Sequence, residues 1–185
     1  SQIQMDEAED LKKLRKDIIE MVYRSKEGHL PSAFSILELL YLLYGSFLKY
    51  NPGNPNSLER DVFILSKGHG SQALYAILAH YGFFEREELF SFCKFDSIFG
   101  GHPDKNKVPG VEASTGSLGH GLPMALGIAL AFKIQNKPNK VFVLIGDGES
   151  EEGTIWESTM LALNLNLNNL VVILDKNRSQ YYTHD

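Results

Sequence analysis

The N-terminal part of the chain has the apolar spacing of an amphipathic helix. Between Glu7 and Tyr23, apolar residues recur at intervals of three and four, which places them on one face of a helix. These residues are Leu11, Leu14, Ile18 and Val22. A second, more apolar helix is predicted to begin at Ser35, because Ser35 and Glu38 have the spacing of a capping box. This second helix should run to about Leu48.

Three short apolar runs further along the chain indicate buried β-strands. Residues 62–65, 141–145 and 170–174 are continuously apolar, and a predicted helix separates the last two runs. Uniformly apolar strands joined by a helix are typical of a parallel sheet that is covered on both faces. We therefore predict an α/β fold, a parallel sheet flanked by helices, forming one domain over residues 1–185. Further helices are predicted from Ser71 onward and over 85–93, 123–134 and 155–163.

A long segment without a periodic pattern lies between two of these helices. Residues 99–121 are rich in Gly, Pro, Ser and His and are predicted to form one loop. Long loops without secondary structure usually serve a functional site. The segment is therefore the first place to look for binding or catalytic residues.

Composition narrows the class of protein without naming a function. The 185 residues carry a net charge of −5 and include a single cysteine, Cys93. A negative balance argues against nucleic acid as the main partner. One cysteine excludes a disulfide framework and favours a reducing, cytoplasmic setting. No run of about 18 apolar residues is evident, so no membrane span is expected.

Polar residues follow two of the predicted strands directly. Asp147 comes after the strand that ends at residue 145, and Asn177 after the strand that ends at residue 174. In open parallel sheets, ligands bind at the carboxyl ends of the strands. Carboxylate and amide oxygens suit Mg²⁺, with Ca²⁺ as an alternative, and Mg²⁺ normally completes its shell with phosphate oxygens and water. Gly146 and Gly148 would let the backbone approach such a phosphate closely, although Asp-Gly is also a common turn dipeptide.

The whole stretch GDGESEEGTIWESTMLALNLNLNNLVVILDKNRSQ resembles the diphosphate-binding motif of thiamine diphosphate enzymes. Within that superfamily the chain is most similar to transketolases, and above all to the N-terminal subunits of split transketolases. The resemblance implies the thiamine diphosphate-binding fold. It implies that Mg²⁺ is held by Asp147, Asn177 and the backbone carbonyl of Ser179. It also implies that Gly148 packs on the diphosphate and that Glu152 couples two cofactor sites across a subunit interface.

Four of the six histidines follow a glycine: His29, His69, His102 and His120. Taken singly, each is compatible with an ordinary loop histidine. The first three resemble the family's active-site histidines, which implies that His29 and His102 face the substrate and that His69 contacts the diphosphate. Histidine suits this chemistry because it exchanges protons near neutral pH. His120 stands where the family often has Gln, and we assign it no role.

The segment from Thr115 to Gly121 resembles the family's glycine-rich loop at the aminopyrimidine of the cofactor. The resemblance implies that Gly116, Ser117 and Leu118 line the cofactor. One departure is Leu30-Pro31-Ser32 after His29, where relatives often have further glycines, so this loop and the sugar it admits are expected to differ. Trp156 agrees with the split-subunit pattern, and we expect it to pack in the core.

The family's catalytic Glu, which activates the pyrimidine ring, has no counterpart in this chain. In the family it comes from a second, pyrimidine-binding domain. The resemblance therefore implies a partner: a C-terminal transketolase subunit or a missing domain, in a homodimer or heterotetramer acting on sugar phosphates. The cofactor domain is itself expected to be incomplete at its C-terminus. Two alternatives stay open, namely another thiamine diphosphate enzyme, such as a deoxyxylulose-phosphate synthase or 2-oxoacid dehydrogenase subunit, and a non-catalytic scaffold of the same fold.

Overall fold

A three-stranded parallel sheet forms the centre of the protein, for which the computed structural model describes residues 2–115, 119–148 and 152–176. Its strands lie in the order β1 (Val62–Leu65), β2 (Val141–Gly146) and β3 (Leu170–Asp175). In the register, Val62 pairs with Val141, which in turn pairs with Leu170. All three predicted strands are present and parallel, so the predicted α/β architecture is confirmed.

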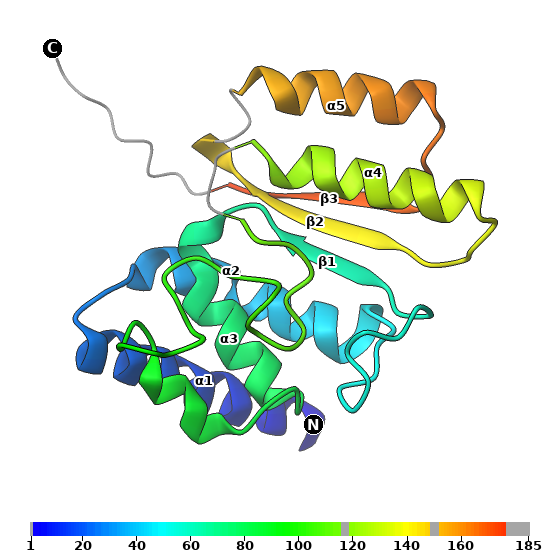
Figure 1. Cartoon of the computed structure of the whole chain (residues 1–185). Coiled ribbons are helices and arrows are strands. Elements are labelled where there is room, and N and C mark those ends of the chain that lie inside the picture. Colours follow the sequence, from blue (N-terminus) through cyan, green and yellow to red (C-terminus); the bar gives the residue numbers. More distant parts are fainter. Residues whose placement is uncertain (1, 116–118, 149–151, 177–185) are drawn as a thin grey trace, which may run out of the picture.

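Helices cover the sheet in two layers (Figure 1). On one side lie α1 (Gln2–Ser25), α2 (Leu30–Leu42) and α3 (Ser71–His80). On the other lie α4 (Gly121–Ile134) and α5 (Gly153–Asn164). No regular helix or strand occurs among the described residues between positions 92 and 120, which agrees with the predicted loop.

The alternation of side chains along the strands divides the core between these two layers. Phe63 and Leu65 of β1 pack with the helices of the first layer, and Val62 and Ile64 pack with α4. All four side chains are at most 3% exposed. Burying a side chain of this size contributes about 1.5–3 kcal/mol, so the strand is held from both faces.

The start of α2 differs from the predicted capping box. The helix begins at Leu30, with Pro31 in its first turn, where a missing backbone donor costs nothing. Ser35 is therefore inside the helix, and its hydroxyl donates to the carbonyl of Ser32 at 3.0 Å. The capping-box prediction is wrong because Pro31 begins the helix earlier than the Ser-Glu spacing suggests. After Leu42 the chain continues as a π-helical turn over Leu43–Phe47.

The stretch Leu30–Phe47 is long and apolar enough, by length and composition, to cross a membrane. Its buried residues Ala33, Ile36, Leu37 and Leu40 are all 0% exposed and belong to the core shared with α1 and α3. We therefore treat it as a core helix. The helix predicted over 85–93 is present as a 3₁₀ helix over Arg86–Ser91, with a capping box at its start.

The sheet is not covered on both faces along its whole width. In β3, Val171, Val172 and Leu174 are 39%, 45% and 40% exposed. On α5, Trp156 is 64% exposed, so the expectation that it packs in the core is wrong. A groove of about 310 Å³ lies between α5 and β3. These two elements leave apolar surface uncovered because β3 is the last strand of the described sheet, with nothing paired beyond it.

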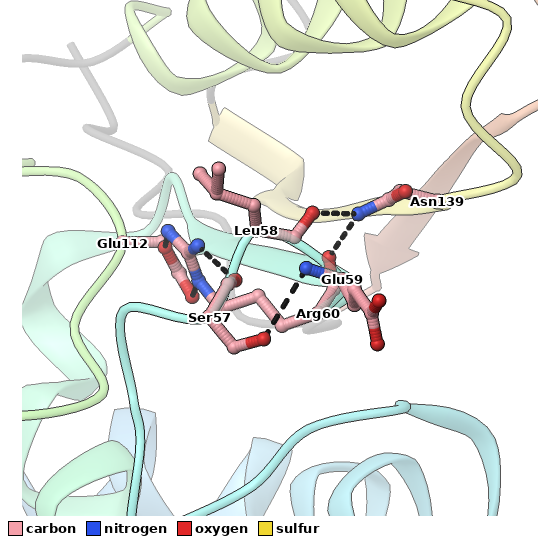
Figure 2. Close-up of polar contacts among 6 residues, drawn as sticks. All are labelled: Ser57, Leu58, Glu59, Arg60, Glu112 and Asn139. Carbon is pink, nitrogen blue, oxygen red and sulfur yellow. Dashed lines mark hydrogen bonds and ion pairs between the residues drawn. The ribbon is translucent and has the colours of Figure 1, made fainter.

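A polar cluster joins the two strands at the end of the sheet where β1 and β2 begin (Figure 2). Arg60 forms a two-point ion pair with Glu112, with nitrogen–oxygen distances of 2.7 and 2.8 Å. Asn139, just before β2, is 5% exposed and donates to the carbonyls of Leu58 and Arg60 at 2.9 and 2.8 Å. Buried carbonyls need such partners, and these fix the start of β1 beside the start of β2.

Candidate active site

Asp147 is the one predicted metal-binding residue that the described part of the chain contains, and it lies at the carboxyl edge of the sheet. Gly146 ends β2 and pairs with Asp175, which ends β3. Asp147 follows Gly146 directly and is partly buried. The other two predicted metal ligands, Asn177 and Ser179, lie outside the described residues. Asp147 therefore stands at the edge where the chain leaves both strands, as predicted for a ligand site in a parallel sheet.

Three histidines from distant parts of the sequence meet at this edge. The ring centroids of His29 and His69 are 6.0 Å apart, and those of His69 and His102 are 5.8 Å apart, both edge to face. All three side chains are exposed. The structure thus brings together the three histidines that the sequence singled out. Their grouping gives an open, protonatable surface that could exchange protons with a bound substrate.

A network of charged and polar groups lies between the histidines and the end of β3. The Lys67 ammonium contacts the Asp175 carboxylate at 2.8 Å and the Ser35 hydroxyl at 3.2 Å. The single proton of the Ser35 hydroxyl is shared between the same carboxylate oxygen, at 2.9 Å, and the carbonyl of Ser32, at 3.0 Å. Sequence reasoning missed these three residues. The only signal for Lys67 was its position two residues before His69. The local pattern marked Ser35 only as a helix cap, because Asp175 lies far from it along the chain.

The end of the glycine-rich loop packs closely on the start of α5. The loop residues Gly116, Ser117 and Leu118, predicted to line the cofactor, lie outside the described residues. Beyond them, Gly119 has φ +79°, and its carbonyl accepts a hydrogen bond from the Thr154 hydroxyl at 3.1 Å. A Cβ on Gly119 would lie 2.7 Å from that hydroxyl and 3.2 Å from the Cβ of Glu152. Only glycine fits this close approach, and Glu152 sits beside it as the residue preceding α5.

The start of α4 packs tightly on the end of β1. A Cβ on Gly121 would come within 2.4 Å of the Cβ of Ser66, which is 1% exposed. This contact sets the first turn of α4 against the carboxyl edge of the sheet. Backbone N–H groups at a helix N-terminus attract anions, so α4 adds a favourable dipole to an edge that already carries Lys67.

Two local features fit a bound diphosphate and magnesium at this edge. A Cβ on Gly148 would meet none of the described residues within 4 Å, which leaves room beside the backbone there. The Thr115 hydroxyl, just before the glycine-rich loop, is buried and finds no partner among the described residues. Within those residues, no cluster of three His, Cys, Asp or Glu side chains could hold a metal alone.

Comparison with known proteins identifies the family. The model of the transketolase thiamine diphosphate-binding domain matches residues 6–181. The chain belongs to the transketolase family. It is 44% identical over 168 residues to an apulose-4-phosphate transketolase subunit of Phocaeicola vulgatus, covering 91% of this chain and 59% of that protein. It is 39% identical over 180 residues to a 6-deoxy-6-sulfo-D-fructose transketolase subunit of Clostridium sp., covering 97% and 66%.

Solved transketolase structures share the fold. The transketolase of Campylobacter jejuni superimposes with a TM-score of 0.82 at 35% identity, covering 92% of this chain and 28% of that one. The transketolase of Leishmania mexicana gives a TM-score of 0.81 at 31% identity, covering 90% and 26%. The chain thus spans between 59% and 66% of the length of the two transketolase subunits and about a quarter of the full-length enzymes.

Proposed function

We propose that this chain is the cofactor-binding part of a split transketolase, which transfers a two-carbon ketol unit from a ketose phosphate to an aldose phosphate. The meeting of His29, His69 and His102 at the carboxyl edge of the sheet carries the proposal. Relatives named as transketolase subunits support it. When bound, thiamine diphosphate supplies the nucleophilic carbon that takes up the ketol unit.

Asp147 and the residues around it would hold the polar end of the cofactor. Its carboxylate is a hard oxygen ligand suited to Mg²⁺, and we assign Asn177 and the Ser179 carbonyl as further ligands. Gly146 and Gly148 leave the backbone open toward the phosphates. Thr115 offers a buried hydroxyl that needs a partner, and next to it Gly116, Ser117 and Leu118 would line the rest of the cofactor.

The histidines would handle protons and orient the substrate. His69 lies between the other two and just after β1, so we place it nearest the diphosphate. His29 and His102 flank it and would donate protons to, or accept them from, substrate hydroxyl and carbonyl oxygens. Donors already aimed at an oxygen that gains negative charge stabilise it without reorganisation. Glu152, beside the glycine-rich loop, would couple this site to a second one across a subunit interface.

A partner chain is the second element of the proposal. The relatives named as transketolase subunits imply a second, complementary chain. To that chain we assign the pyrimidine-binding domain and its catalytic Glu, in a dimer or heterotetramer in the cytoplasm. The uncovered apolar residues of β3 and α5 support an interaction of this kind, since large apolar surfaces mark contacts with further protein. The isolated chain should then show no ketol transfer, and turnover by it alone would contradict the partner requirement.

Calorimetric titration with thiamine diphosphate and Mg²⁺ tests the cofactor assignment. The chain and its partner should together bind the cofactor, and Asp147→Ala should weaken binding by at least about 100-fold, since losing even an outer-shell partner of a metal ligand costs about 10- to 100-fold. Asp6→Ala, which removes an exposed carboxylate from α1, is the control and should bind as the wild type does. Absence of binding by the wild-type pair would favour a non-catalytic scaffold. Binding without ketol transfer to any sugar phosphate would point to another thiamine diphosphate enzyme.

A further inference from the structure

The three histidines reach one site although their segments share no regular element. His29 lies before α2, His69 lies just before α3, and His102 lies in the long loop. All three segments are in contact with, or joined through the chain to, the first two turns of α3. This part of the helix is therefore the element to examine for residues that set the geometry of the site.

Two buried hydroxyls of α3 hold the backbone in front of His102. The Ser71 hydroxyl donates to the carbonyl of Gly101 at 2.8 Å, and the Tyr75 hydroxyl donates to the carbonyl of Gly100 at 2.9 Å. Ser71 and Tyr75 are four residues apart and so lie on one face of the helix. Both side chains are 0% exposed. Burial raises the pKa of Tyr75 well above its usual range, which keeps the hydroxyl protonated and able to donate.

The glycine pair makes these two hydrogen bonds important. Gly100 and Gly101 have no side chains that could anchor the backbone, and glycine has more conformational freedom than any other residue. A Cβ on either glycine would have no contact closer than 3.6 Å, so packing leaves the pair little constrained. The hydroxyls of Ser71 and Tyr75 therefore hold the peptide groups that lead into His102, next to the hydrogen bond that the Phe99 carbonyl accepts from the Cys93 N–H at 2.8 Å.

The same helix turn also fixes the segment of His29. Gly28 has φ +105°, and a Cβ there would lie 1.8 Å from the side-chain nitrogen of Gln72, which is 1% exposed. Gln72 follows Ser71 directly, so adjacent residues of one turn contact the segments of two different histidines. His69 is joined to this turn through the chain itself.

We propose that the first two turns of α3 position the histidine cluster, and that Ser71 and Tyr75 are positioning residues that hold His102 against His69 through the carbonyls of Gly101 and Gly100. Neither residue would touch the substrate. The consequence for catalysis rests on the function proposed above. Displacing a reacting group by about 1 Å can cost about 100-fold in rate, so loss of either hydroxyl should lower kcat by about 10- to 100-fold and leave KM for the cofactor nearly unchanged.

Tyr75→Phe is the first test, because it keeps the ring between Phe92 and Phe99 and removes only the hydroxyl. Tyr81→Phe is a matched control at the other end of α3, where the hydroxyl also donates to a backbone carbonyl, that of Tyr41, at 2.9 Å. Histidine side-chain NMR of the chain in complex with its partner should show a shifted resonance for His102 in Tyr75→Phe. Tyr81→Phe should leave that resonance in place.

The outcomes separate positioning from general destabilisation and from the proposed function. Ser71→Ala, which removes the second hydrogen bond, should shift the same resonance, and it serves as the test if Tyr75→Phe does not fold. An unchanged His102 resonance in a folded Tyr75→Phe or Ser71→Ala variant would overturn the proposal, as would an equal shift in Tyr81→Phe. Because the resonance is read without turnover, a wild-type protein that lacks ketol transfer would refute the proposed function and leave the positioning result standing.

Discussion

Replacing either Lys67 or Asp175 alone should lower the free energy of unfolding strongly, whereas replacing both together should lower it only a little. Their side chains are 12% and 13% exposed and meet at 2.8 Å. Removing one partner of a fully buried pair costs about 3–5 kcal/mol, because the remaining charge is left without compensation. Since both groups keep some contact with water, we expect about 2–3 kcal/mol for either Lys67→Met or Asp175→Asn.

A double-mutant cycle in equilibrium urea unfolding measures this interaction. The double variant should lose only about 1 kcal/mol, since replacing both charges of a buried pair is often close to neutral. The coupling free energy would then be about 3–5 kcal/mol, at or above the upper end of the roughly 0.5–3 kcal/mol that residues in one network usually show. Glu20→Gln, which breaks an exposed ion pair with Arg24 on α1, should cost less than about 1 kcal/mol. Additive losses in the cycle, or single losses no larger than that of Glu20→Gln, would refute the reasoning.

Three further predictions concern other parts of the molecule. Gly28→Ala should lower the free energy of unfolding, measured by thermal unfolding, by about 2–5 kcal/mol, because the added Cβ is strained at φ +105° and clashes with the buried Gln72. A loss below about 1 kcal/mol would mean that the Gln72 side chain can move away. Asn139→Ala should cost about 2–3 kcal/mol by urea unfolding, because two carbonyls lose their donor, and a neutral result would mean that water replaces the amide. Burial and then the hydrogen bond to Asp10 raise the pKa of Tyr41 to about 12. The stability that the protonated Tyr41 hydroxyl contributes to the folded state is therefore fully present below pH 10 and is lost as pH rises through about 12. Urea unfolding at several pH values should show that the free energy of unfolding falls less between about pH 10 and pH 12 in Tyr41→Phe than in the wild type.

The pattern of apolar residues was sufficient to predict the layers of the fold and the edge of the sheet at which the candidate site lies. Residues 62–65, 141–145 and 170–174 are short, continuous apolar runs, and a strand buried on both faces leaves little alternative. The motif that begins at Gly146 and the glycine–histidine pairs then indicated the family. This worked because metal and phosphate chemistry needs particular residue types at fixed spacings, and those are visible along a single chain.

Predictions from the local sequence were wrong where residues distant in the chain determine a helix start or the burial of a side chain. Ser35 has the spacing of a helix cap, but Pro31 begins the helix earlier and the Ser35 hydroxyl bonds to Asp175 instead. Trp156 looks like a core residue by its type, yet its side chain on α5 is 64% exposed. Burial depends on which elements stand opposite a side chain, and no local pattern specifies them.

By itself the sequence determined the parallel α/β class, the carboxyl-edge position of Asp147 and the choice of histidines, because these follow from side-chain periodicity and from chemistry-bearing motifs. Only the tertiary structure decided that His29, His69 and His102 meet, that Lys67 compensates Asp175, and that Ser71 and Tyr75 hold the glycine pair before His102. Each of these contacts joins residues that are far apart in the chain. The pairing of β1, β2 and β3 brings Lys67 near Asp175, and the packing of α3 against the neighbouring loops brings the other residues together.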